Sequence, residues 1–371
     1  MTENARKLCS LLLTAAFVVT LAGCAPGLPD PEPETIEPVA TPAPTPEPVK
    51  LNYNYLTGLY DLPDDRVGMR PYAISINNNY DGWPQSGTSK ADVILEIETE
   101  GGITRLMCIY SDVSDAGNIG SIRSLRHQFV QGMYQWNPII VHIGTSNYCN
   151  EILWSYGIKT LNGYYTERFL FVDTERLKTY ASEHCKFTNK ELILAGLEEQ
   201  GIEQKLDGEM PPAFNFTTDE GRVIPSGGSA QNLTFDFSEG YYDGTFKYNP
   251  VTRRYYKFQD GQAHIDAGDG TTSTQLSFDN VIVLFAYIGG IKDTILTDVY
   301  YDGGGEGYYF SQGRYDKIHW EKPAWNENFI LTKEDGSELV VNTGKTYLAV
   351  IRDYYGDDIK IDYNVEPSEE E

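Results

Sequence analysis

Acidic and imidazole side chains that could carry out hydrolysis occur in the first half of the chain. Glu96, Glu98 and Glu100 alternate along one stretch, and His142 ends an apolar run that begins at residue 139. Residues two apart on a strand stand roughly 6.5–7 Å apart. That spacing lies inside the ~6.5–9.5 Å separation of the two carboxyl groups in inverting glycosidases. Because any strand with alternating acids meets it, the pattern names candidate catalytic residues without establishing a catalytic pair.

Arginine side chains that could bind an anion lie close by in the sequence. Arg105 follows the acidic stretch, and Gly120, Ser121, Arg123 and Arg126 open a segment that we predict to be a helix. Free N–H groups at a helix start and guanidinium groups both bind carboxylates and phosphates. We therefore hypothesise a basic cradle for such a group.

The same arginines have candidate partners within the protein. Gly101-Gly102 suits a two-residue hairpin turn, because both positions can adopt positive φ. In that register Glu98 faces Arg105, and Glu100 faces Ile103. Opposite charges across strands contribute roughly 0.2–1 kcal/mol. The simpler interpretation is that the arginines pair with an internal carboxylate, from Glu96, Glu98 or Glu100. The alternative is that they bind an external ligand, and the sequence leaves both open.

His142 precedes Gly144-Thr145-Ser146, which is not the nucleophile elbow of the hydrolases. A histidine in such a place is more often a hydrogen-bonded core residue. The sequence contains no His-Glu-x-x-His motif, phosphate-binding loop or dinucleotide fingerprint. The spacing of Cys108, Cys149 and Cys185 matches no zinc pattern, so buried thiols are the simplest expectation, and the sequence leaves one disulfide among them open. No metal and no cofactor is expected.

The amino terminus predicts export. Arg6 and Lys7 precede an uncharged, mostly apolar run over residues 8–21, which ends in Leu21-Ala22-Gly23-Cys24. The run is short for a membrane span, which needs about 20 apolar residues, and it fits a signal peptide. Leu-Ala-Gly-Cys resembles the lipobox of bacterial lipoproteins. This resemblance predicts a signal peptide over 1–23, lipid on Cys24, and a protein held on the outer face of the cell membrane.

Residues 24–50 form a predicted tether. Positions 25–50 contain nine prolines and no aromatic residue, a composition that cannot bury a core and favours polyproline II. At about 3.1 Å per residue the tether could reach roughly 80 Å.

The remaining composition favours an α+β protein. The net charge of -25 argues against nucleic acid as a partner. We predict a mixed α/β domain over 51–207, a mainly β domain over 208–365 and an acidic tail over 366–371. The abundance of tyrosine and glycine in the second half favours strands and turns.

Hydrophobic periodicity places the elements of the first half. We expect strands over 71–77, 91–100, 103–110 and 139–143, and helices over 122–136, 149–156 and 189–200. The long predicted helix presents Ile122, Leu125, Phe129, Met133 and Trp136 on one face. In the second half, strand-like runs fill 232–258 and 278–350, with Asp335-Gly336 as a hairpin turn.

Several strings together resemble the YerB-like bacterial lipoproteins, a family without an established activity. They are Arg70-Pro71, Pro84-Gln85-Ser86-Gly87, Ala91-Asp92, Glu100-Gly101-Gly102-Ile103-Thr104-Arg105, Gly120-Ser121-Ile122-Arg123-Ser124-Leu125-Arg126 and His142-Ile143-Gly144-Thr145-Ser146, with weaker matches at Asn280-Val281-Ile282-Val283 and Gly344-Lys345-Thr346. The resemblance covers most of residues 60–350. It implies a two-part ectodomain on a lipid anchor and supplies no catalytic residues. Ser121 departs from the family pattern, which has proline there.

Two function classes follow. The first is a non-catalytic binding or scaffolding lipoprotein of the cell envelope, with a wall polymer or a membrane-bound wall-synthesis protein as partner. The second is an envelope-polymer hydrolase that uses the glutamates and His142. The anchor, the tether and the missing catalytic signature favour the first. A shared open cleft for the acids and His142 would favour the second.

Overall fold

The structure is a computed structural model that describes residues 51–362, apart from 219–220, 240–241, 269 and 271. The expectations for the signal peptide, Cys24, the tether and the tail at 366–371 concern residues outside this range. Within the described residues, no helix is both long and apolar enough to cross a membrane.

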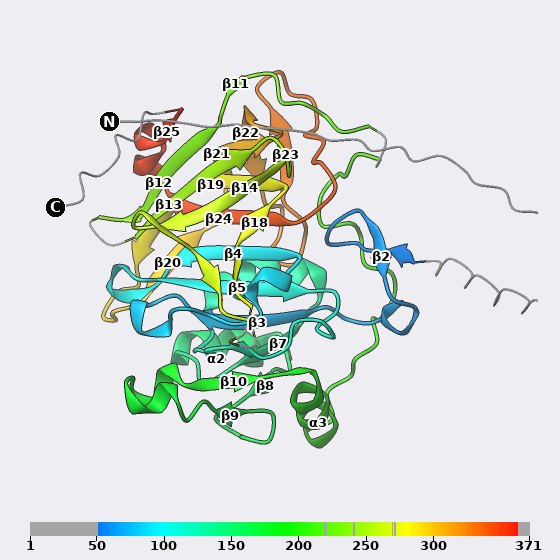
Figure 1. Ribbon diagram of the computed structural model, residues 1–371, viewed down its shortest axis with the longest axis vertical. Coiled ribbons are helices and arrows are strands. Elements are labelled where there is room, and N and C mark those ends of the chain that lie inside the picture. The colour runs from blue at the N-terminus through cyan, green and yellow to red at the C-terminus, as the bar shows by residue number, and fades with distance from the viewer. Residues whose placement is uncertain (1–50, 219–220, 240–241, 269, 271, 363–371) are drawn as a thin grey trace, which may run out of the picture. The chain divides into compact units, whose positions relative to one another are not determined.

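A large mixed sheet runs through both halves of the chain (Figure 1). Its strands, in spatial order, are β11 (Gly228–Ser229), β22 (Arg314–Glu321), β21 (Gly305–Ser311), β19 (Asn280–Gly290), β24 (Thr346–Arg352), β4 (Val93–Glu98), β5 (Thr104–Tyr110), β3 (Tyr72–Asn77), β7 (Ile139–His142) and β8 (Leu161–Asn162). Two more strands join its side branches, β20 (Thr297–Tyr300) on β19 and β23 (Ile330–Lys333) on β22. The halves meet where β24 pairs in parallel with β4, with Ala349 opposite Glu96.

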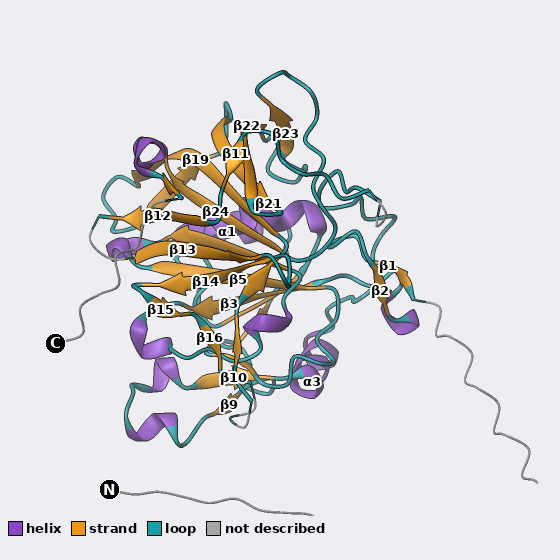
Figure 2. Ribbon diagram, turned by 45° about the horizontal axis from the view of Figure 1, so that its top comes forward, coloured by secondary structure: helices purple, strands orange, loops and turns teal. Residues whose placement is uncertain are grey.

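A second sheet packs against the first. It consists of β15 (Gln262–Ala263), β14 (Arg254–Gln259), β13 (Tyr242–Asn249), β12 (Asn232–Ser238), β25 (Lys360–Ile361) and β18 (Ser277–Phe278). The smaller sheets pair β1 (Asn52–Tyr53) with β2 (Tyr60–Leu62), β10 (Lys186–Thr188) with β6 (Ile119–Gly120) and β9 (Phe171–Val172), and β16 (Ile265–Asp266) with β17 (Thr274–Gln275). Figure 2 shows the helices as short segments among these strands.

Among the residues that the structure describes, the α-helices all lie in the first half: α1 (His127–Met133), α2 (Asn147–Ser155) and α3 (Lys190–Gln200). The prediction of a mixed first half and a mainly β second half is confirmed. The predicted strands at 71–77, 91–100, 103–110 and 139–143 and the two later helices correspond to β3, β4, β5, β7, α2 and α3.

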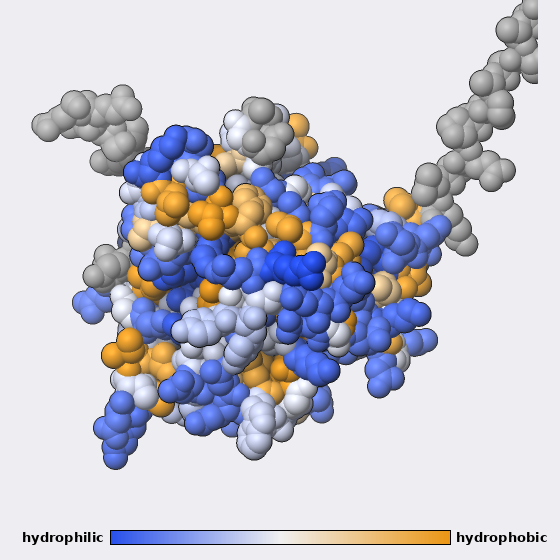
Figure 3. Space-filling model, turned by 90° about the horizontal axis from the view of Figure 1, so that it is seen from below, coloured by the Kyte–Doolittle hydropathy of each residue, from blue (hydrophilic) through white to orange (hydrophobic). Residues whose placement is uncertain are grey.

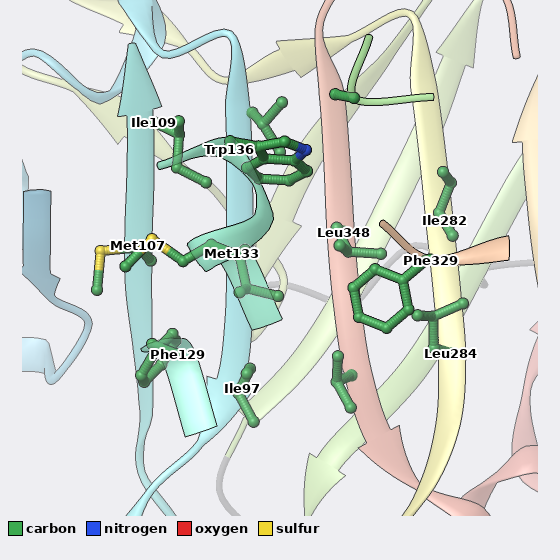
Figure 4. Close-up of a cluster of buried hydrophobic side chains, with 14 of the residues drawn as sticks. Ile97, Met107, Ile109, Phe129, Met133, Trp136, Ile282, Leu284, Phe329 and Leu348 are labelled. Atoms are coloured by element: carbon green, nitrogen blue, oxygen red, sulfur yellow. The ribbon is translucent and has the colours of Figure 1, made fainter. Parts of the chain in front are cut away.

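The large sheet is buried on both faces, which explains its apolar central strands. On one face, Ile97 and Met107 pack against Phe129 and Met133 from α1 (Figure 4). On the other face, strand residues pack against the second sheet, for example Tyr347 against Phe246 with ring centroids 4.8 Å apart. Polar side chains on β4 and β5 are therefore buried between two layers.

The predicted two-residue hairpin turn at Gly101-Gly102 is wrong. Residues 99–103 form the connection, in which the Thr99 amide donates to the Ile103 carbonyl. The resulting register places Ile97 opposite Arg105 and Glu98 opposite Thr104. Because one residue of slip reverses the face of every side chain, Arg105 lies on the α1 face of the sheet, whereas Glu96 and Glu98 lie on the other.

The predicted start of the helix near Ser121 is also wrong, because α1 begins at His127. Residues 121–125 are extended and hydrogen-bonded on both sides. The Arg123 amide donates to the Ser75 carbonyl of β3, and the Leu125 amide donates to the Gly144 carbonyl. Ile122 and Leu125 are buried in this extended segment. Their spacing is therefore compatible with an extended segment as well as with the predicted helix.

Candidate functional site

Glu96 lies in a buried polar network between the two sheets. One carboxylate oxygen accepts hydrogen bonds from Asn78 at 2.9 Å and Thr104 at 2.6 Å. The other accepts from the Tyr347 hydroxyl and lies 3.5 Å from the ammonium of Lys257. Glu96 is therefore fully hydrogen-bonded and paired with Lys257, as expected of a buried structural ion pair.

Lys257 extends this network to His264, a residue that the sequence analysis did not select. Its ammonium lies 3.1 Å from His264 Nδ1, and the other ring nitrogen of His264 lies 2.9 Å from Gln85 Oε1. Burial, with the charge of Lys257, lowers the pKa of His264 well below its usual value. A neutral His264 suits this position, because Lys257 can then donate to its unprotonated nitrogen.

The other two candidate glutamates are also paired with cations. Glu98 accepts a bidentate pair of hydrogen bonds from Arg352 at 2.7 and 2.9 Å. Glu100 forms a bidentate pair with Arg126, whose Nε donates to it at 2.9 Å. Burial opposes the ionisation of Glu100, but the hydrogen bond from Arg126 and the charges of Arg105 and Arg126 hold its pKa below the ordinary value.

His142 is buried and is not joined to the glutamates by any hydrogen bond in the described part of the chain. Its Nδ1 lies 2.9 Å from the Gly144 carbonyl, and its Nε2 lies 2.8 Å from the Thr160 hydroxyl. Since a carbonyl only accepts, Nδ1 carries the proton. Burial lowers the pKa of His142 to about 4. These contacts orient the 144 and 160 loops.

Gly120 and Ser121 are also buried. The Gly120 amide donates to the Ser86 carbonyl, and the Ser121 carbonyl accepts from the Asn77 amide. A Cβ on Gly120 would lie 2.6 Å from a ring carbon of Phe187. The peptide bond between Gly120 and Ser121 is cis. Both residues thus pack against neighbouring strands and do not mark a helix start.

The three candidate arginines gather beside this segment. Arg105 donates to the Ser124 carbonyl at 2.6 Å, and its Nη2 is 3.8 Å from Glu100. Burial and the charges of Arg126 and Arg123 lower the pKa of Arg105 to about 9. The structure therefore brings the three guanidinium groups together.

Arg123 is the least satisfied of the three. Its Nη1 lies 3.3 Å from Glu183, whose side chain is largely exposed. Its Nε is buried, and among the described residues it has no hydrogen-bond partner. Burial and the charge of Arg123 also lower the pKa of the nearby His184. This arrangement could receive a carboxylate or a phosphate at Arg123, whereas Arg126 is occupied by Glu100.

A metal site finds no support in the part of the chain that the structure describes. That part contains no group of three or more histidine, cysteine, aspartate or glutamate side chains placed to hold an ion. Cys108, Cys149 and Cys185 are free thiols and buried, which agrees with the simplest expectation from the sequence and decides against a disulfide among them.

Comparison with known proteins gives concordant matches. Residues 56–203 match the family model described as the N-terminal domain of a protein of unknown function (DUF3048), and residues 233–348 match the corresponding C-terminal domain. A Bacillus subtilis (strain 168) protein named "Putative lipoprotein YerB" is 27% identical over 286 residues, which are 76% of this chain and 82% of that protein. The crystal structure of the YerB protein from Bacillus subtilis superimposes with a TM-score of 0.71 at 25% identity, covering 84% of this chain and 99% of that one. With both halves matched in order, the chain belongs to the DUF3048 family, the YerB-like proteins of unknown function.

Proposed function

We propose that this protein is anchored by lipid to the extracytoplasmic face of the cell membrane and binds a component of the cell envelope without catalysis. The leader, the cysteine at position 24 and the proline-rich tether support the anchor, as does the lipoprotein name of the Bacillus subtilis relative. In this proposal, domains over 51–207 and 208–365 stand away from the membrane, at the depth of the cell wall.

The observation that carries the binding proposal is the unsatisfied Arg123 beside Arg105. Buried polar atoms usually have hydrogen-bond partners, yet Arg123, whose side chain is 22% exposed, pairs with one exposed carboxylate, and its buried Nε has no partner among the described residues. The pairing of all three candidate glutamates with cations counts against hydrolysis by them. We therefore favour an anionic wall polymer as the ligand, with Arg123 as its main contact.

Binding can be tested by co-sedimentation of the detergent-solubilised, lipidated protein with purified cell-wall sacculi that retain their anionic polymers. Arg123→Glu should reduce binding at least tenfold, because it reverses the charge that meets the anion. Arg168→Glu makes the same change at an exposed arginine and should bind like the unmodified protein. Equal binding by both variants would refute the anion site, and binding through a membrane-bound wall-synthesis protein would then be the remaining candidate.

The anchor has a separate test. Cells that express the protein are fed an alkyne-tagged fatty acid, and incorporation into the protein is measured. Cys24→Ala should abolish labelling, whereas Cys185→Ala, at a buried thiol, should retain it. Undiminished labelling of Cys24→Ala would exclude the lipid anchor at that residue.

A further inference from the structure

An open groove of about 670 Å³ lies between the end of α2, the loop after it and the end of α3. Its base contains Leu153, Ile158 and Ile202, which are mostly buried. The volume falls within the ~300–1,000 Å³ range of ligand sites. The groove is separate from the buried network around Glu96.

Two aromatic side chains border this groove while facing water. Trp154 is 85% exposed and Tyr165 is 78% exposed. The adjacent Tyr164 is 80% exposed. Large aromatic rings usually bury most of their surface, and exposed apolar surface beside a hollow marks an interaction site. Figure 3 views the molecule from below and shows its hydrophobic side chains in separate patches among hydrophilic ones.

The polar side chains of the groove are uncharged, apart from one lysine. Asn150, Thr160, Asn162 and Gln200 line it together with Lys159. No carboxylate is among the lining residues, although the chain contains 54 aspartates and glutamates. A groove of aromatic faces, amides and a hydroxyl suits a ligand that has apolar faces and many hydroxyl groups.

Two of these polar groups are held in place by hydrogen bonds. The Asn162 side-chain oxygen accepts from the amides of Gly144 at 2.9 Å and Tyr164 at 3.0 Å. These bonds leave the N–H groups of the Asn162 side chain to donate elsewhere. The Thr160 hydroxyl is held by His142 at 2.8 Å. Prior ordering of this kind reduces the entropy cost of binding.

We propose that this groove binds a glycan chain, with Trp154 and Tyr165 stacked on sugar rings. Sugar rings present C–H groups on their faces and hydroxyl or acetamido groups at their edges. The aromatic rings match the faces, the asparagines match the edges, and Lys159 can pair with a carboxylate substituent. A peptide partner would bring charged side chains, for which the groove offers one lysine and no acid.

The backbone segment that carries Arg123 passes near the loop that leads to the glycan groove. Gly144 lies between them, since a Cβ built on it would be 3.5 Å from Ser124 Oγ and 3.8 Å from a ring carbon of Tyr164. Ser124 follows Arg123 in the chain, and Tyr164 precedes Tyr165. Because residues 121–125 are extended, the side chains of Arg123 and Ser124 project to opposite sides, so a polymer must be several sugar units long, with anionic substituents, to contact both sites. The inference therefore rests on the proposed function and names the class of polymer.

The test uses two probes and the lipidated full chain in detergent. The soluble probe is the uncharged hexasaccharide of N-acetylglucosamine, with binding followed by calorimetry, and the insoluble probe is purified sacculi. Trp154→Ala and Tyr165→Ala should each weaken binding of the hexasaccharide at least tenfold. Tyr287→Ala removes a comparably exposed tyrosine from β19 and should leave binding unchanged. Thermal unfolding of each variant should match the unmodified protein.

The outcomes separate the two proposals. Arg123→Glu should still bind the uncharged hexasaccharide, because that probe carries no anion. If Trp154→Ala binds both probes like the unmodified protein while Arg123→Glu loses the sacculi, the glycan groove is refuted and the anion site stands. The glycan assignment is also overturned if the unmodified protein does not bind the hexasaccharide. It is likewise overturned if Trp154→Ala binds both probes normally and differs only in failing to co-purify with a partner protein.

Discussion

The carboxylate of Glu96 and the ammonium of Lys257 lie 3.5 Å apart, and neither side chain has exposed surface. Glu96 belongs to β4 in the region matched by the N-terminal family model, and Lys257 belongs to β14 in the region matched by the C-terminal model. The pair therefore joins the two family regions at the centre of the molecule. The Tyr347 hydroxyl donates to the same oxygen of Glu96 that lies near Lys257. Asn78 and Thr104 donate to the other oxygen.

Lys257→Met should destabilise the protein by about 3–5 kcal/mol, because it leaves Glu96 as an uncompensated buried charge. The free energy of unfolding can be measured by urea titration at neutral pH. Because the large sheet continues through both halves, the unmodified protein should unfold in one transition.

The double variant Glu96→Gln/Lys257→Met is the matched control. It removes both charges, so it should recover a large part of the loss seen with Lys257→Met alone. A cost of less than about 1 kcal/mol for Lys257→Met would show that the pair does not hold the halves together.

The sequence did not predict this pair, for a local reason. Strand β14 reads Arg-Tyr-Tyr-Lys-Phe-Gln, and its buried residues are Tyr255, Lys257 and Gln259. Alternation alone would sooner place Tyr256 and Phe258 inside, since lysine is seldom buried without a partner. The partner lies far away in the chain, on a strand that the two-sheet packing brings close. The fold class was predictable because it depends on periodicity within short segments.

All three candidate glutamates are paired with cations, as one of the two interpretations of the sequence expected, but the partner expected for Glu98 was wrong. The strand register differs by one residue from the prediction, so Arg105 lies opposite Ile97 instead of Glu98 and its side chain is on the α1 face. Glu98 consequently pairs with Arg352, at the end of a strand from the second half. Pairings between distant segments depend on sheet order, which hydrophobic patterns do not encode.

Arg126 and Arg123 should differ sharply in their contribution to stability. Arg126→Gln removes the bidentate partner of Glu100 and should cost about 1.5–3 kcal/mol, the usual loss for hydrogen bonds to charged groups. Arg123→Gln removes a pairing with an exposed glutamate and should cost less than about 1 kcal/mol. Urea unfolding of the two variants provides the comparison.

Equal costs for the two arginine substitutions would contradict this assignment. In particular, a loss above about 2 kcal/mol for Arg123→Gln would show that Arg123 is a structural residue. The anion site would then lose its main support, whatever the binding experiment gave.

Acid should destabilise the protein in part through His142. The pKa of His142 in the folded protein is about 4, and in the unfolded chain it is about 6.5. Between these values the unfolded chain binds a proton that the folded protein excludes, so stability falls as the pH falls from about 6.5 to 4. For this fully buried ring the loss amounts to about 3 kcal/mol.

His142→Gln isolates that contribution. The variant should be less stable than the unmodified protein at pH 7, and the difference should shrink towards pH 4.5, as measured by urea unfolding. Burial raises the pKa of Asp92 to about 6, which gives the opposite slope in this range. That contribution is present in both proteins and cancels in the comparison. Parallel stability curves would show that His142 does not carry the expected effect.

The three thiols of the described chain should be unreactive until the protein unfolds. Burial raises the pKa of Cys149 to about 12 and raises that of Cys108 further, and the thiolate is the reactive form. Residues 51–371, which lack Cys9 and Cys24, should therefore react negligibly with a thiol-specific reagent at pH 8 and expose three thiols in urea. Cys185 is the most informative, because it lies in the loop region beside His184 and donates to the Ala181 carbonyl. Labelling of Cys185 in the native protein, identified by peptide mass, would show that this region opens, and Cys185→Ala should abolish only that label.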